Sequence, residues 1–127
     1  MKLLRAGIVI WGVLLLLPDH AHPGELLMLE QAGCVWCAQF DQEIAPAWPK
    51  TEEGRRAPLR RIDINNEWPA ELDHIKRDRM TPTFILLHEG EEVGRLRGYV
   101  GDEFFWYRIG ELIDLLLMEE TARGRDE

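Results

Sequence analysis

The chain contains two cysteines, and both lie in the short segment GCVWC at residues 33–37. An apolar run, Leu26 to Leu29, precedes this segment, and a helix-like stretch from Ala38 to Ile44 follows it. A Cys-x-x-Cys pair at such a junction suits a dithiol that cycles with a disulfide. The N–H groups and partial positive charge of a helix N-terminus stabilise the first sulfur as thiolate. The second sulfur lies one turn further on, where it can close or resolve a disulfide.

This arrangement predicts that Cys34 is the nucleophile and Cys37 the resolving cysteine. The Cys34 thiolate attacks a substrate disulfide, and Cys37 then attacks the mixed disulfide and releases the reduced substrate. We expect the pKa of Cys34 to lie below its free value of about 8.5. A histidine between the cysteines would make a stronger oxidant, and the apolar residues Val35 and Trp36 therefore favour a reductase. Trp36 is expected to be partly exposed and to contact substrates.

The cysteine pair could also serve as a structural disulfide, as part of a metal site, in another type of disulfide exchange, or in a binding site. A structural disulfide would contribute little stability, because so short a ring hardly constrains the unfolded chain. Two cysteines are only half of a zinc site, and His74 and His88 do not stand at ligand spacing, so no metal is predicted. A disulfide oxidase or isomerase remains open, as does a binding module without catalysis, which would keep its partner after Cys34 is replaced.

The size and charge of the chain limit its function further. A length of 127 residues suggests one domain, which we place at residues 24–118, followed by a flexible charged tail at 119–127. The formal net charge of −8 disfavours binding to nucleic acid or to anionic membrane surfaces.

Residues 1–21 have the pattern of a secretory signal peptide. Two basic residues precede an apolar run, Ala6 to Leu17, which is shorter than the ~20 residues that span a bilayer. Cleavage after Ala21 would leave Asp19 where a small residue is preferred, so an uncleaved anchor remains an alternative. Export to the periplasm would bring the cysteines into a compartment where disulfides form.

The remaining segments alternate between strand-like and helix-like patterns. Four consecutive apolar residues before the cysteines suit a central strand buried on both faces. Phe105, Ile109 and Leu112 recur at helical spacing, whereas residues 50–58 are polar, contain glycine and proline, and are predicted to form a loop. The predicted strands span 25–31, 59–65, 84–88 and 93–99, and the predicted helices span 38–44, 69–79 and a segment that Asp102 opens as N-cap.

This order, with Cys-x-x-Cys opening the first helix and Thr-Pro-Thr at 81–83 opening the hairpin, resembles the thioredoxin fold. The resemblance runs from about Glu25 to Met118. It implies an α/β protein with a central mixed sheet of about four strands flanked by helices. In this family the proline is cis, packs against the disulfide and leaves the preceding backbone free to pair with a substrate peptide. The resemblance gives these roles to Pro82 and Thr81.

More narrowly, the chain resembles the small exported thioredoxins of bacterial sulfur-oxidation clusters, the SoxS type, which lack the extra N-terminal strand and helix of cytosolic thioredoxin. The resemblance implies a monomer with no cofactor beyond the Cys34–Cys37 disulfide. Its partners would be disulfide-bearing periplasmic proteins, including sulfur-oxidation carriers, and a membrane thiol transporter as electron donor. A thioredoxin-like reductase for cytochrome c maturation is an alternative within the same family.

The chain departs from the family at one position that matters for proton transfer. Cytosolic thioredoxin carries a buried acid six positions before its first cysteine, paired with a lysine, and here these positions hold Met28 and, approximately, Leu59. Glu30 is the nearest acid. It would accept the proton of Cys37 if its side chain turned toward that residue, and water is the alternative acceptor.

Overall fold

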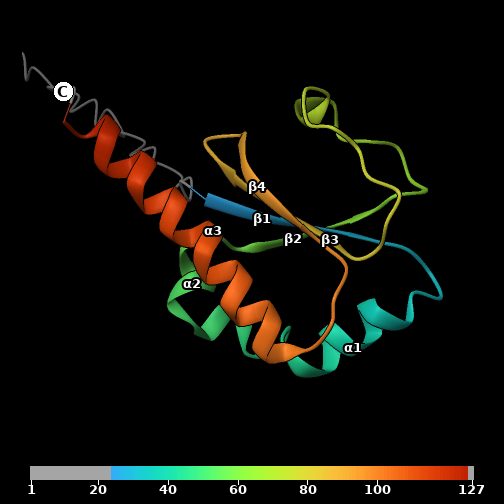
Figure 1. Ribbon diagram of the computed structural model, residues 1–127. Coiled ribbons are helices and arrows are strands. Elements are labelled where there is room, and N and C mark those ends of the chain that lie inside the picture. The colour runs from blue at the N-terminus through green and yellow to red at the C-terminus, as the bar shows by residue number, and fades with distance from the viewer. Residues whose placement is uncertain (1–23, 126–127) are drawn as a thin grey trace, which may run out of the picture.

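The computed structural model describes residues 24–125, which form a single sheet with helices against it (Figure 1). The predicted signal peptide lies outside the described residues. The elements in chain order are β1 (Gly24–Glu30), α1 (Val35–Glu43), η1 (Trp48–Lys50), α2 (Glu52–Arg56), β2 (Leu59–Asp63), η2 (Ala70–Leu72), β3 (Thr83–His88), β4 (Glu91–Arg97) and α3 (Asp102–Arg123).

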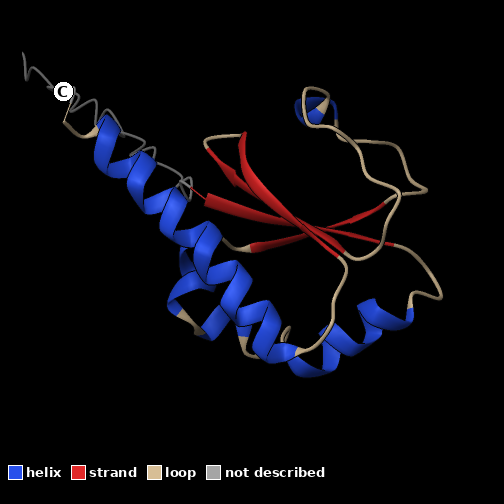
Figure 2. Cartoon of the chain, in the orientation of Figure 1, coloured by secondary structure: helices blue, strands red, loops and turns tan. Residues whose placement is uncertain are grey.

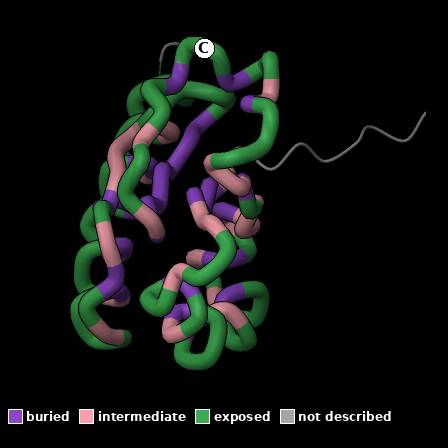
Figure 3. Tube along the Cα trace, turned by 90° about the vertical axis from the view of Figure 1, so that its right-hand side faces the viewer, coloured by how far each residue is buried: buried purple, intermediate pink, exposed green. Residues whose placement is uncertain are grey.

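The sheet has four strands in the order β2-β1-β3-β4. β1 runs parallel to β2 and antiparallel to β3, and β3 and β4 form an antiparallel hairpin. β1 therefore lies inside the sheet, and its residues Leu26 to Leu29 are fully buried, as the unbroken apolar run predicted. Buried residues are concentrated in the strands at the centre of the molecule, while most residues of the connecting loops are exposed or half-buried (Figure 3).

Two hydrophobic clusters cover the two faces of the sheet. The larger one lies under α1, η1 and α3, where Phe40 packs 4.8 Å from Phe84 and 5.3 Å from Phe105, measured between ring centroids. The smaller one lies on the opposite face, under the long connection between β2 and β3, residues 64–82. Figure 2 shows the three α-helices on one side of the sheet and this connection on the other.

The prediction of a helix at residues 69–79 is wrong. Only the 3-10 turn η2 forms, and Pro69, with an extended ψ of 128°, is its N-cap and not its first helical residue. Leu72 and Ile75 are nevertheless buried against the sheet, and the N–H of Ile75 donates to the carbonyl of Leu72 at 2.8 Å. The spacing of these two apolar residues correctly predicted that they are buried. It did not predict the backbone, because a loop with one turn places the two side chains on the same side just as a helix would.

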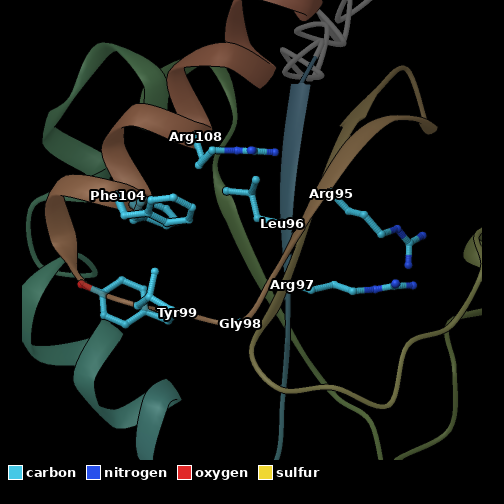
Figure 4. Close-up of a pocket in the computed structure, with 9 residues that line it drawn as sticks. Arg95, Leu96, Arg97, Gly98, Tyr99, Phe104 and Arg108 are labelled. Carbon is cyan, nitrogen blue, oxygen red and sulfur yellow. The ribbon is translucent and has the colours of Figure 1, made fainter.

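Asp78 ties this connection to the edge strand β4. Its carboxylate accepts a hydrogen bond from Arg97 at 2.6 Å and from the Met80 N–H at 3.1 Å, and Arg95 lies 3.6 Å away. Figure 4 shows Arg95 and Arg97 pointing away from Tyr99, toward the side of the 64–82 connection. Burial by itself would raise the pKa of Asp78, but the bonds from Met80 and Arg97 hold it below its usual range.

The prediction of a loop at residues 50–58 is also wrong, because most of this segment belongs to η1 and α2. Thr51 caps α2 by accepting a hydrogen bond from the Gly54 N–H at 3.0 Å. Gly54 is buried, and a Cβ at this position would lie 1.7 Å from the carbonyl oxygen of Trp48. The glycine that favoured a loop in the sequence is therefore needed for close packing of two short helices.

The last helix differs from its prediction at both ends. Gly101, with φ of 122°, is the N-cap, and Asp102 is the first helical residue. The helix then continues to Arg123, so the first five residues of the expected tail, 119–123, are helical. Ion pairs extend it beyond the core, because Arg56 lies 3.7 Å from Glu120 and Arg123 pairs with Glu89.

The Gly54→Ala substitution should lower the free energy of unfolding by about 2–4 kcal/mol, since the backbone of η1 must move to make room for the methyl group. Chemical denaturation at equilibrium measures this loss. Gly110→Ala is the matched control, because a Cβ there meets nothing within 4 Å and alanine favours the helix by up to about 1 kcal/mol. Equal effects of the two substitutions would contradict the packing.

The Asp78→Asn substitution should lower the free energy of unfolding at pH 7 by about 1–3 kcal/mol, because two arginines lose their carboxylate. A depressed pKa gives stability that is present above the unfolded value and lost as pH falls, so the gap to wild type should close below about pH 4. Denaturation at a series of pH values tests this. Asp73→Asn, at an exposed aspartate 3.8 Å from Arg77, is the control and should change stability little.

Candidate functional site

The two cysteines form a disulfide at the junction of β1 and α1, with their Cα atoms 5.2 Å apart. Cys34 is the N-cap of α1, and its Sγ accepts a hydrogen bond from the Cys37 N–H at 3.1 Å. The first turn of α1 holds no acidic residue that would oppose a thiolate. Cys34 is partly exposed, whereas Cys37 is 5% exposed. The accessible sulfur thus stands at the helix N-terminus, which is the geometry that the predicted roles require.

The residues around Cys34 present an apolar surface. Gly33 turns the chain with φ of 77°, and the Cys34 N–H donates to the carbonyl of Gln31 at 3.3 Å. Val35 and Trp36 follow with exposed side chains, Trp36 at 53%. The expected exposure of Trp36 is therefore present, and its contact with substrates stays a prediction.

The Thr81–Pro82 segment lies beside the disulfide loop. The Thr81–Pro82 peptide bond is cis, and Pro82 is buried while Thr81 is partly exposed. The Gln31 side chain donates to Thr81 Oγ1 at 3.0 Å and so joins this segment to the loop that carries Cys34. In the described part of the chain the N–H and C=O of Thr81 have no backbone partner, which leaves both available to an extended peptide.

A hollow of about 530 Å³ lies next to the disulfide and contains a charged cluster; we call it the disulfide hollow. Both cysteines line it, with Glu30, Asp41 and Asp63. Arg61 donates to Glu30 at 2.7 Å and also pairs with Asp41. Burial by itself would lower the pKa of Arg61, but the bonds to Asp41 and Glu30 raise it, so this side chain stays charged.

The cluster shows how the chain departs from cytosolic thioredoxin. Residues two apart on a strand face the same side, so Glu30 points to the face of Met28, and Arg61 to the face of Leu59. The acid and the base that the family carries near 28 and 59 are thus replaced by a pair one strand repeat closer to the disulfide. Glu30 was predicted from the sequence, whereas Arg61 and Asp41 were not. The shared offset of two residues was the available signal.

Other chemistry finds less support among the described residues. No group of three or more His, Cys, Asp or Glu side chains suited to a metal ion occurs in residues 24–125. His74 Nε2 donates one hydrogen bond, to the carbonyl of Gly90 at 2.9 Å. None of the described helices combines the length and the apolar character needed to cross a bilayer. A hollow of about 230 Å³ between β4 and α3 is lined by Leu96, Tyr99 and Phe104 and contains neither cysteine (Figure 4).

Comparison with known proteins identifies close structural relatives. No family model and no curated protein matches the chain. Among solved structures, it is 44% identical to the periplasmic thioredoxin SoxS from Paracoccus pantotrophus in its reduced form; the match covers 73% of this chain and 98% of that one, with a TM-score of 0.70. The thioredoxin of Fasciola hepatica, 18% identical over 71% of this chain and 81% of its own, has a TM-score of 0.53 and is alike in fold. The expected thioredoxin fold is confirmed.

In the reduced protein Cys34 should react with iodoacetamide at least about tenfold faster than Cys37, because Cys34 alone combines exposure with a position at the helix N-terminus. Brief labelling followed by peptide mass spectrometry measures both rates. Labelling after unfolding in denaturant is the control and should make the two rates similar. Faster labelling of Cys37 in the folded protein would contradict the assignment of roles.

Proposed function

Since the chain belongs to the SoxS-type thioredoxins and is a thiol–disulfide oxidoreductase, we propose that it reduces disulfides of partner proteins in the periplasm. The observation that carries this proposal is the unequal exposure of the two sulfurs at one helix N-terminus, with only Val35 and Trp36 between them. An apolar, uncharged pair between the cysteines adds nothing to thiolate stability beyond the helix itself, which favours a reductase over a strong oxidant.

The reaction proceeds in two exchanges. The Cys34 thiolate attacks one sulfur of the partner's disulfide, and the other sulfur leaves as thiolate and takes up a proton. Cys37 then loses its proton and attacks Cys34 Sγ, which forms the Cys34–Cys37 bond and releases the partner's second thiolate. Two electrons pass from the dithiol to the partner, which leaves with both cysteines reduced.

The partner's segment would lie along Thr81. Its backbone N–H and C=O are unpaired within the described residues and would hydrogen-bond to an extended peptide that crosses Cys34. Trp36 and Met80, both more than half exposed, would pack on either side of that peptide. Pro82 is buried under this position and has no N–H that could compete for the peptide's carbonyls.

Glu30 is the proposed acceptor of the Cys37 proton. It lines the disulfide hollow with Cys37, and Arg61 holds its carboxylate there at 2.7 Å. A positioned carboxylate would remove the proton as the mixed disulfide is resolved, and water would take this role more slowly.

The proposed partners are suggested by the similarity to a periplasmic thioredoxin, SoxS. We propose disulfide-bearing periplasmic proteins, including carriers of sulfur oxidation, as substrates. Since the periplasm lacks a reducing thiol pool, electrons would come from a membrane thiol transporter. We propose that the protein acts as a monomer and that it uses no cofactor beyond the Cys34–Cys37 pair.

A reduced sample of the protein mixed with insulin tests the proposed direction. One insulin disulfide should be reduced for each Cys34–Cys37 pair oxidised, as counted by alkylation and mass spectrometry. Cys37→Ser should accumulate a mixed disulfide with insulin, and Cys34→Ser should form none. If instead the oxidised protein rapidly introduced disulfides into reduced insulin, the protein would be an oxidase; binding that survives Cys34→Ser without exchange would indicate a binding module.

The Glu30→Gln substitution should slow resolution of the mixed disulfide by about tenfold or more near pH 7 and leave the first attack by Cys34 unchanged. Rapid acid quench and mass spectrometry measure the lifetime of the mixed disulfide. Glu119→Gln, at an exposed position on α3, is the control and should change neither step. An unchanged lifetime in Glu30→Gln would assign the proton to water.

A further inference from the structure

A second hollow, of about 430 Å³, lies between the 64–82 connection and Gln31. Arg77, Arg79, Asn65 and Trp68 line it together with Gln31, and we call it the arginine hollow. It is built from the 64–82 connection, which reaches the same end of the sheet as the start of α1 (Figure 1).

The arginine hollow adjoins the disulfide hollow. Gln31 lines both, and its side chain holds Thr81 Oγ1 at 3.0 Å. At the end of β2, Asp63 of the disulfide hollow accepts a hydrogen bond from the Asn65 N–H of the arginine hollow at 2.8 Å. A peptide that pairs with Thr81 and crosses Cys34 therefore extends over both hollows.

The two hollows carry opposite charge. Arg79 is exposed and has no carboxylate within 4 Å among residues 24–125, while Arg77 lies over the Trp68 ring at 5.3 Å, with Asp73 3.8 Å away as its nearest acid. Asp78, the acid that lines this hollow, is occupied by the two arginines of β4.

On the disulfide side, three carboxylates line the hollow, those of Glu30, Asp41 and Asp63, and Arg61 pairs with the first two. Exposed arginines beside the redox centre do not follow from composition, because the chain as a whole carries a net charge of −8. A charged peptide that crosses Cys34 would therefore meet arginines at one end and carboxylates at the other.

We propose that the arginine hollow binds an acidic segment of the substrate protein and thereby fixes the direction in which the substrate's cysteine crosses Cys34. The inference rests on the proposed reductase function and adds a requirement for its partner. Guanidinium groups match carboxylates in geometry and charge, and such pairs speed encounter and exclude the reversed orientation. When the peptide lies the other way round, its carboxylates are repelled by the carboxylates of the disulfide hollow.

The test uses two peptides of equal composition and zero net charge, each with one cysteine activated as a 2-thiopyridyl disulfide. One carries aspartates before the cysteine and lysines after it, and the other has the reverse order. A third peptide has serines on both sides. The Cys34 thiolate attacks the peptide sulfur and displaces 2-thiopyridone, which takes a proton; Cys37 then attacks Cys34 Sγ and releases the peptide as its thiol.

The release of 2-thiopyridone by the reduced full-length protein should differ by about threefold or more between the two charged peptides, after division by each peptide's rate with dithiothreitol. The difference should shrink when salt is raised to about 0.5 M. Arg79→Glu should abolish or reverse the difference. Lys50→Glu, the same type of charge change at an exposed residue of η1, should leave it intact. Arg77→Gln should reduce it, in a variant whose near-UV spectrum shows Trp68 still packed.

Equal rates for the two charged peptides, or equal effects of Arg79→Glu and Lys50→Glu, would overturn the inference while reduction of the serine peptide leaves the proposed function standing. If none of the three peptides is reduced, the proposed function fails and the inference fails with it.

Discussion

The antiparallel pairing of β1 with β3 is the interaction on which the site depends. β1 is buried on both faces, and its last pairing, Leu29 with Thr83, sets the Thr81–Pro82 segment opposite the loop that leaves β1. The loop after the same strand end carries Cys34, which is the N-cap of α1. A slip of one residue in this register would turn the fully buried strand over and separate the cysteines from the backbone that is to hold the substrate.

The two faces of the sheet supply different parts of the site. The face under α1 and α3 carries the rigid aromatic core and, at its open end, the Glu30–Arg61 pair. The opposite face is covered by the 64–82 connection, which is anchored to β4 through Asp78 and carries the exposed arginines. A covering segment without an α-helix can therefore hold charged side chains near the redox centre while three of its residues, Trp68, Leu72 and Ile75, complete the smaller core.

The sequence was informative where a single element determines the outcome. The apolar run of β1 predicted a buried central strand, and the Cys-x-x-Cys pair at a helix start with the Thr-Pro-Thr before β3 predicted the thioredoxin fold and the redox centre. It was misleading where tertiary packing decides, since Gly54 permits contact between η1 and α2, and the apolar spacing of Leu72 and Ile75 fits a loop. Arg61 was missed because its pairing with Glu30 depends on the register between β1 and β2, for which the shared offset of two residues was the one signal in the sequence.

The central claim is that one exposed thiolate at a helix N-terminus, with an apolar pair beside it, makes the Cys34–Cys37 dithiol a reductant. The most direct measurement is the reduction potential of this pair, obtained by equilibrating the protein in redox buffers and counting its thiols by alkylation. The account predicts a value near that of thioredoxin, about −270 mV, which requires a membrane electron donor. A value near about −120 mV, that of a strong periplasmic oxidant, would contradict it.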